Sequence, residues 1–254
     1  FKTGYKLIDD NIGGIESSTV TIITGPSNHA KSILMINIAR NMLLFNRESM
    51  NENDAVVFIT LEDDIYKLLR RIIGIFGQVS ANHLKELFVK GSEMLSSSDL
   101  TDEMKSKNKE DVNSIITKLL EETVINVTKA KCKFIIKHCN ENSFSMNDAT
   151  TFVSKLNMEG ISVKALCIDY IDVMIPNGGN TGDTYDMQGQ IVQEMRLASR
   201  AMYIPVITIT QNSKLAENMQ QSMNNSVIGD SYKKVRYADN IIMLRQRHDL
   251  DLLN

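Results

Sequence analysis

Short apolar runs rich in Val and Ile alternate along this chain with stretches whose apolar residues recur every three or four positions. Runs of the first kind are typical of parallel strands buried on both faces, and stretches of the second kind are typical of helices that pack one face on a core. The pattern predicts strands at residues 20–24, 55–60, 133–137, 163–169, 205–211 and 240–244. It predicts helices at residues 31–42, 65–76, 112–127, 146–159 and 185–202. Strands alternating with helices predict an α/β fold, a mostly parallel β-sheet flanked by helices.

The remaining segments are more polar. Residues 1–18 are interpreted as an N-terminal loop, in which a pair of glycines favours a turn. Residues 80–131 are polar and mostly helical in pattern. Residues 176–183 and 212–232 each follow a predicted strand, and both predict loops at the carboxyl edge of the sheet, where α/β proteins bind ligands.

A tight loop joins the first predicted strand to the first predicted helix, which is the setting of a phosphate-binding loop. In such a loop, backbone N–H groups face an anion, Lys31 reaches the β- and γ-phosphates of ATP, and Ser32 ligates Mg²⁺. The residues predicted to bind nucleotide here are Gly25, Pro26, Ser27, Asn28, His29, Ala30, Lys31 and Ser32. An ordinary strand–loop–helix connection with a surface lysine is the alternative.

The loop departs at one position from the P-loop pattern G-x-x-x-x-G-K-[ST]. Ala30 stands where the pattern has its second glycine. The alanine Cβ is the smallest side chain that can intrude between backbone and phosphate. The sequence therefore predicts a distorted but working loop.

Two predicted strands end in carboxylates at the same edge of the sheet as the loop. Glu62 follows the strand at 55–60 and is the candidate catalytic base that orients an attacking water, although a neighbouring Asp that caps the next helix would explain the acidic cluster as well. Asp169 ends the strand at 163–169, where a carboxylate can support Mg²⁺; a polar strand end without a ligand is the alternative. Asp172 is a weaker candidate for the same metal.

Gln211 ends the strand at 205–211 and is a candidate sensor of the γ-phosphate. A glutamine that only caps the strand end is the alternative.

Composition limits the remaining possibilities. The chain has 254 residues, 43% of them hydrophobic, which suits one large α/β domain or two small ones. The net charge of −3 gives no basic footprint for nucleic acid over the whole chain, although a ring can gather a few basic side chains in a channel. Three cysteines without C-x-x-C spacing predict a reducing, cytoplasmic setting, and no apolar run of membrane-spanning length predicts a membrane partner.

Several windows agree in order and spacing with one family over nearly the whole chain. The chain resembles the ATPase domain of DnaB-type hexameric replicative helicases, within the RecA-like group, and looks most like phage-encoded members. The windows are Thr3-Gly4 with Leu7–Asp9 and Gly13-Gly14, Gly25–Ser32, Phe58–Glu62, Ile168–Ile171, Pro205–Gln211 and Ala238–Met243.

The resemblance implies a homohexameric, ATP-driven 5′→3′ helicase that translocates on single-stranded DNA, with primase and a helicase loader as further partners. It implies the nucleotide roles already given for Lys31, Ser32, Asp169, Glu62 and Gln211. It also implies that the loops after the strands at 163–169 and 205–211 grip DNA. Lys214 is then a candidate DNA contact and Arg245 a candidate contact of the nucleotide base.

The resemblance also implies that residues 1–254 form a single ATPase domain. The family's N-terminal collar domain and the strand with its trans-acting arginine finger are not found in this sequence, so we expect an excised motor domain. Two other functions remain open. One is another RecA-like ATPase, such as a recombinase or a clock-type ring, and the other is a nucleotide-binding assembly protein that does not hydrolyse ATP.

Overall fold

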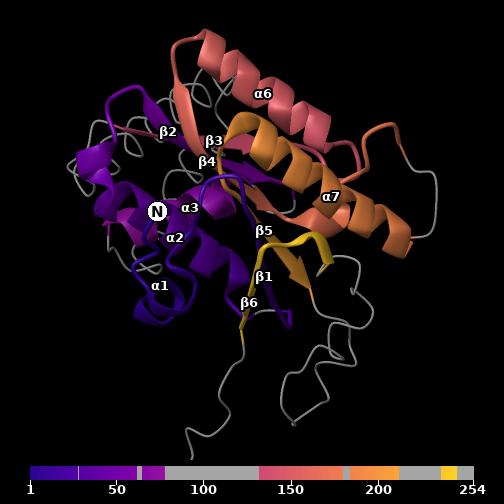
Figure 1. The fold of residues 1–254 in the computed structure, drawn as a ribbon, viewed down its shortest axis with the longest axis horizontal. Helices are drawn as coiled ribbons and strands as arrows, with labels where there is room; N and C mark the ends of the chain where they lie inside the picture. Colours follow the sequence, from indigo (N-terminus) through magenta and orange to yellow (C-terminus); the bar gives the residue numbers. More distant parts are fainter. Residues whose placement is uncertain (28, 62–64, 78–131, 180–183, 212–235, 245–254) are drawn as a thin grey trace, which may run out of the picture.

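The computed structural model describes the chain apart from residues 28, 62–64, 78–131, 180–183, 212–235 and 245–254. The described strands form one six-stranded parallel sheet in the order β3-β2-β4-β5-β1-β6 (Figure 1). They are β1 (Val20–Gly25), β2 (Asp54–Thr60), β3 (Lys133–His138), β4 (Ser162–Asp169), β5 (Val206–Gln211) and β6 (Asn240–Met243). The predicted α/β fold with a parallel sheet is confirmed, and each predicted strand is found to within about one residue.

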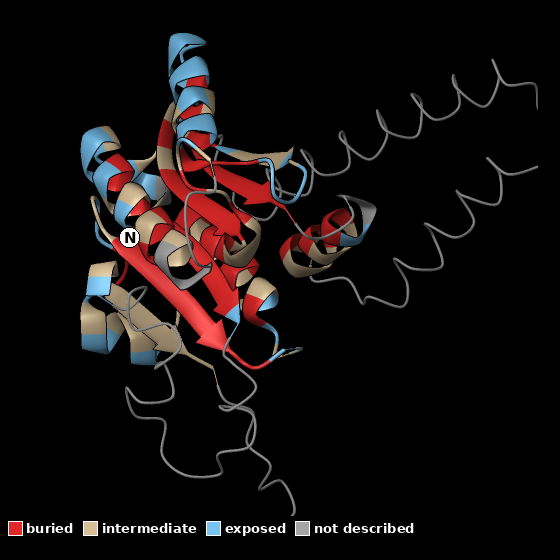
Figure 2. Ribbon diagram, turned by 90° about the vertical axis from the view of Figure 1, so that its right-hand side faces the viewer, coloured by how far each residue is buried: buried red, intermediate tan, exposed pale blue. Residues whose placement is uncertain are grey.

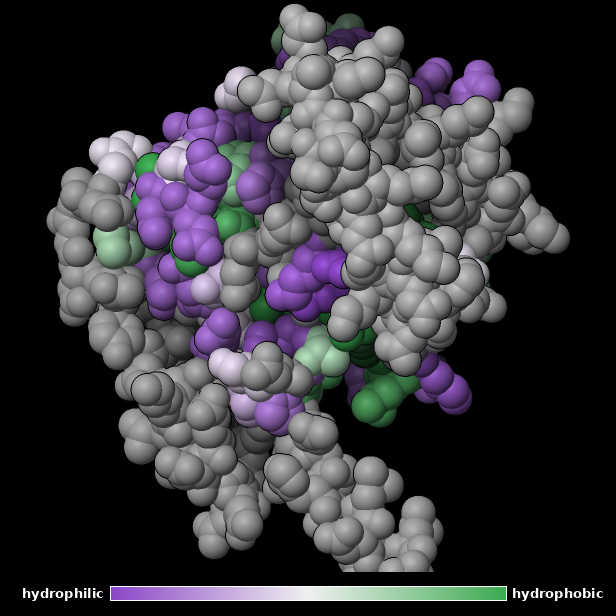
Figure 3. Space-filling model, turned by 180° about the vertical axis from the view of Figure 1, so that it is seen from behind, coloured by the Kyte–Doolittle hydropathy of each residue, from purple (hydrophilic) through white to green (hydrophobic). Residues whose placement is uncertain are grey.

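Helices cover both faces of the sheet. The described helices are α1 (Lys6–Ile12), α2 (Lys31–Phe45), α3 (Ile65–Gly77), α6 (Met146–Met158) and α7 (Thr184–Met202), with 3-10 turns η1 (Arg47–Ser49) and η2 (Ile171–Val173). α6 and α7 pack on one face, and α2 and α3 pack on the other (Figure 1). The helix predicted at residues 112–127 lies outside the described residues. Seen from behind, the described surface is mainly hydrophilic, with hydrophobic residues in scattered patches (Figure 3).

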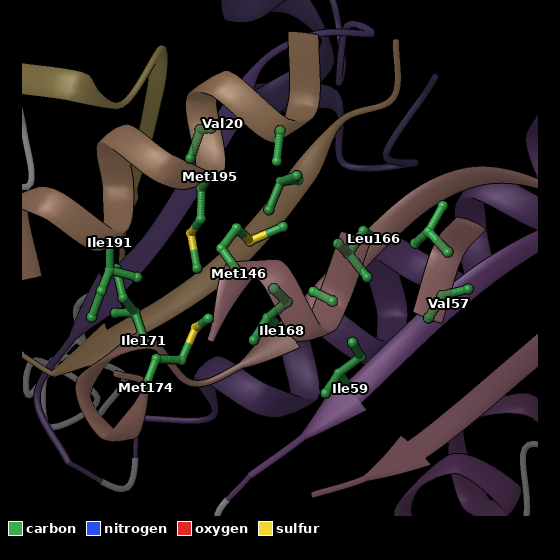
Figure 4. Packing of buried hydrophobic residues seen from close by; sticks show 14 of the residues in the cluster. Val20, Val57, Ile59, Met146, Leu166, Ile168, Ile171, Met174, Ile191 and Met195 are labelled. Carbon is green, nitrogen blue, oxygen red and sulfur yellow. The ribbon is translucent and has the colours of Figure 1, made fainter. Parts of the chain in front are cut away.

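Two hydrophobic clusters form because successive side chains of a strand point to opposite faces. Val57 and Ile59 of β2 belong to the cluster under α6 and α7, whereas Phe58 between them belongs to the cluster under α2 and α3. Figure 2 shows the strands buried between helices whose outer sides are exposed. In the first cluster, Ile191 and Met195 of α7 pack against strand side chains (Figure 4). Burial on both faces explains why these strands are continuous apolar runs rather than alternating ones.

α6 begins with a capping box, one of the two starts that the sequence allowed. The side chain of Ser145 accepts a hydrogen bond from the backbone N–H of Asp148, and the Asp148 carboxylate accepts one from the backbone N–H of Ser145 at 2.8 Å. The same carboxylate accepts the Ser145 hydroxyl at 2.6 Å. These hydrogen bonds stabilise the ionised carboxylate and therefore lower the pKa of Asp148.

The predicted N-terminal loop is wrong for Lys6–Ile12, which form α1. None of the residues of α1 is buried, so the helix leaves no strong apolar period in the sequence. It is held instead by polar contacts: the carboxylate of Asp9 accepts hydrogen bonds from the backbone N–H groups of Thr3 and Gly4, at 2.8 and 3.0 Å. The helix ends at Gly13, whose φ of 73° is left-handed and favours glycine.

Across the described residues, the structure contains no helix of the length and apolar character that a membrane span requires.

Candidate functional site

The loop between β1 and α2 lies at the carboxyl edge of the sheet, as its sequence predicts. β1 ends at Gly25 and α2 begins at Lys31. The side chain of Lys31 folds back on the loop, where its ammonium donates to the carbonyl oxygens of Gly25 at 2.9 Å and Pro26 at 2.7 Å. Lys31 is only 8% exposed, and a buried ammonium needs such acceptors. The lysine is therefore an internal part of the loop, which disagrees with the alternative of a surface lysine.

Ala30 adopts a left-handed backbone conformation, with φ 57° and ψ 25°, at the N-cap of α2. Glycine adopts this conformation without strain, whereas a residue with a Cβ is disfavoured there by about 1 kcal/mol. The loop thus keeps the backbone turn that glycine would give, although the sequence supplies alanine. The cost is borne by the folded state, and no rearrangement of the strand or helix accompanies it.

A cavity of about 430 Å³ opens beside the loop. It brings together most of the nucleotide-site residues that the sequence predicts and the structure describes. Those that line it are Ser27, His29, Ala30, Lys31, Ser32, Asp169 and Gln211. They come from three segments far apart in the chain, so the sheet has assembled one polar site from the ends of β1, β4 and β5.

Asp169 ends β4 and is only 2% exposed. Its carboxylate and the hydroxyl of Ser32 line the same cavity, and both are hard oxygen ligands of the kind that Mg²⁺ prefers. Because Mg²⁺ takes its remaining ligands from water and substrate phosphates, two protein oxygens fit it. The described residues contain no group of three or more His, Cys, Asp or Glu side chains that would form an all-protein metal cage.

β2 delivers the predicted catalytic base toward the same place. Thr60, the last residue of β2, is level with Asp169, and the backbone N–H of Leu61 donates to the carbonyl oxygen of Asp169 at 2.7 Å. Glu62 follows immediately in the sequence but lies outside the described residues, as do Asn28, Lys214 and Arg245.

Gln211 lies next to the loop because β1 and β5 are neighbouring strands. Gly25 and Gln211 are register partners at the ends of those strands. The hydroxyl of Ser27 donates to the side-chain carbonyl oxygen of Gln211 at 3.2 Å. The sequence could suggest a polar strand end, and the sheet order supplies the contact with the loop.

Three residues of the site carry roles that the sequence did not indicate. Lys67 and Arg71 of α3 line the cavity, and their i, i+4 spacing on an amphipathic helix after β2 was the available signal. Asp172, considered above as a metal ligand, directs its carboxylate to Thr210 and to the backbone N–H of Gln211, at 3.0 Å from each. No spacing rule in the sequence points to that contact.

The charge of Asp169 also acts on the core behind it. Burial raises the pKa of the Cys167 thiol to about 12, and the nearby Asp169 carboxylate contributes to the same rise. The thiol is therefore neutral and acts as a core side chain rather than a nucleophile.

Comparison with known proteins agrees with this geometry. Residues 1–251 match the family described as the DnaB-like helicase C terminal domain. The fold is similar to a solved structure of a DnaB-like replicative helicase and its interactions with primase, at 18% identity and a TM-score of 0.68, and to the solved ATPase domain of a phage helicase, at 17% identity and a TM-score of 0.67. Each match covers 96% of this chain, but 51% of the first structure's chain and 75% of the second, so this chain spans about half the length of the first. No curated protein matches the sequence.

Proposed function

This chain belongs to the family of DnaB-like helicase C-terminal domains, and we propose that it is the ATP-hydrolysing motor domain of a replicative DNA helicase. One observation carries the proposal: Lys31, Asp169 and Gln211, from three different elements, line a single cavity beside a phosphate-binding loop. This arrangement supplies a cation for phosphate, a carboxylate for Mg²⁺ and an amide for the transferred phosphoryl group.

In the proposed reaction, the loop and the N-terminus of α2 bind the phosphates of ATP through backbone N–H groups. Lys31 exchanges its carbonyl acceptors at Gly25 and Pro26 for phosphate oxygens. Ser32 and Asp169 hold Mg²⁺, which when bound neutralises phosphate charge. Because Asp169 is buried, its carboxylate acts in a low-dielectric environment in which charge interactions are strong.

Glu62 is proposed to orient the attacking water and to accept its proton. The proximity of Leu61 to Asp169 supports this role, since the next residue then leaves β2 at the edge of the cavity. Gln211 is proposed to donate its side-chain amide to the γ-phosphate and so to report whether that phosphate is present.

The assembly and its partners are part of the same proposal. Six copies would form a ring around single-stranded DNA, with Lys214 as a DNA contact and Arg245 near the nucleotide base. Translocation would run 5′→3′, in the cytoplasm where replication takes place, or in the host cytoplasm for a phage protein. Primase and a helicase loader are the expected protein partners, and the primase interactions of one fold relative support the first of these.

A second function is favoured by the conformation of Ala30. A Cβ in a left-handed turn beside the phosphates would hinder the close approach that hydrolysis requires. A protein of this fold that binds ATP to stabilise an assembly, without hydrolysing it, is therefore the second candidate.

The decisive experiment measures ATPase rate against single-stranded DNA concentration in the whole protein, in Lys31→Ala and in Lys6→Ala, an exposed lysine of α1. DNA-stimulated turnover that is lost in Lys31→Ala and kept in Lys6→Ala supports the motor. Turnover that ignores DNA supports another RecA-like ATPase. ATP binding without turnover in the unmodified protein supports the second candidate.

A further inference from the structure

β5 continues beyond the end of its neighbour β4. The two strands pair from Leu166 to Ile168 on β4, and β4 ends at Asp169, whereas β5 extends to Gln211. The carboxylate of Asp172, in η2, lies beside the extension. It accepts the hydroxyl of Thr210 at 3.0 and 3.1 Å, one distance to each oxygen, and the backbone N–H of Gln211 at 3.0 Å. A side chain thus takes the place of a neighbouring strand at the residue proposed to sense phosphate.

The same carboxylate reaches a second element. The side-chain amide of Gln188, in α7, donates to Asp172 at 3.1 Å. α7 begins at Thr184, directly after residues 176–183, which the sequence assigns to a DNA-binding loop. Asp172 is therefore bonded both to the helix that follows this segment and to the end of β5.

The connection continues to the phosphate-binding loop through the side chain of Gln211, which accepts the Ser27 hydroxyl at 3.2 Å. Four residues, Gln188, Asp172, Gln211 and Ser27, form an unbroken series of contacts from α7 to the nucleotide site. Hydrogen bonds to a carboxylate are stronger and more directional than neutral ones. A shift of α7 relative to the sheet would therefore move Gln211 or break a costly bond.

We propose that Asp172 is a positioning residue that couples the placement of α7 to the setting of Gln211 at the nucleotide site. The inference rests on the proposed function, because coupling to DNA requires that the loop before α7 contact it. Asp172 touches neither nucleotide nor DNA in this proposal. Its effect is on the ratio between DNA-stimulated and basal ATP hydrolysis, and a contiguous series of contacts becomes a coupling pathway only when such a ratio changes.

The test compares three variants of the whole protein with the unmodified one. Gln188→Ala removes the bond to α7 and leaves the contacts of Asp172 with β5. Asp172→Asn removes the charge and keeps the size. Gln193→Ala is the matched control, because Gln193 is an exposed glutamine of the same helix and lines a different cavity. Basal ATPase, maximal DNA-stimulated ATPase and the Kd of a fluorescent ATP analogue are measured for each.

For Gln188→Ala we expect a basal rate within about twofold of the unmodified protein and a stimulation ratio lowered about threefold or more. For Asp172→Asn we expect a similar loss of the ratio together with a lower basal rate, because Gln211 loses its charged acceptor, and an unchanged Kd. Gln193→Ala should behave as the unmodified protein. A merely structural role for Asp172 would lower thermal stability without changing the ratio.

The inference is overturned if Gln188→Ala and Asp172→Asn both keep the unmodified stimulation ratio, or if Gln193→Ala lowers it equally. If Asp172→Asn does not fold, Gln188→Ala alone decides, since Gln188 joins the series through its bond to Asp172. Failure of the proposed function is seen separately, in the unmodified protein: hydrolysis that DNA does not stimulate there rejects the motor, and the coupling with it.

Discussion

The hydroxyl of Ser27 donates to the side-chain carbonyl oxygen of Gln211 across 3.2 Å, which brings the phosphate-binding loop into direct contact with the end of β5. The two residues meet because β1 and β5 pair in parallel with Gly25 level with Gln211. A side-chain amide is thereby held beside the loop before any substrate-specific contact is considered.

Gln211→Ala should separate ATP binding from hydrolysis. Loss of an amide that interacts mainly with the transferred phosphoryl group lowers the rate by about tenfold or more and leaves the Kd of an ATP analogue within about threefold. Steady-state ATPase assays and fluorescence titration measure the two quantities, with Gln193→Ala as the control. Equal losses of binding and turnover would mean that Gln211 only helps to hold ATP.

Ala30→Gly should stabilise the protein, because glycine adopts the left-handed conformation of residue 30 without the penalty of a Cβ. We expect a gain of about 1 kcal/mol in the free energy of unfolding, measured by urea denaturation. Ala201→Gly, in the last turn of α7, is the matched control and should destabilise, since glycine is unfavourable in a helix. Destabilisation by both substitutions would contradict the strain assigned to Ala30.

Arg71→Ala should weaken nucleotide binding, since this side chain lines the cavity beside the phosphate-binding loop. Removing a cation near a polyanion lowers affinity, by roughly tenfold at low salt and by less at high salt because ions screen the interaction. Arg70→Ala is the matched control from the same helix, because Arg70 does not line the cavity. Titration of a fluorescent ATP analogue at two salt concentrations tests this, and equal effects of the two substitutions would place the cause in the charge of the whole helix.

The capping box of α6 should make stability depend on acid. The pKa of Asp148 is lowered in the folded state, so its contribution is complete above the unfolded pKa of about 3.9 and is lost as the pH falls through the lower folded value. Asp148→Asn should therefore differ most from the unmodified protein near neutral pH, by about 1 kcal/mol, and the difference should close below about pH 4. Urea denaturation from about pH 2 to about pH 7 spans this range, and a difference independent of pH would assign the effect to the side-chain hydrogen bond alone.

Much of the fold was predictable because burial on both faces writes each strand as an unbroken apolar run. β2, with residues such as Phe58 buried on one face and Ile59 on the other, is an example. α1 was missed because its stability comes from Asp9 capping backbone N–H groups, a contact that leaves no apolar period. Local spacing was enough for Lys31 and Asp169, since loop and strand ends are local features. It was not enough for Asp172, whose partners depend on sheet order and on where β4 stops.

The position of β1 in the sheet also sets the order in which the protein can be completed during synthesis. β1 leaves the ribosome early, but its two neighbours are β5 and β6, at residues 206–211 and 240–243. An added Cβ at Gly25 would lie 2.8 Å from the carbonyl oxygen of Leu244, so the first residue of the loop is also enclosed by one of the last to be translated. The nascent chain must therefore carry an apolar strand without its partners through most of translation. Such long-range parallel pairing folds slowly and exposes the intermediate to aggregation, which makes this segment a natural client for chaperones.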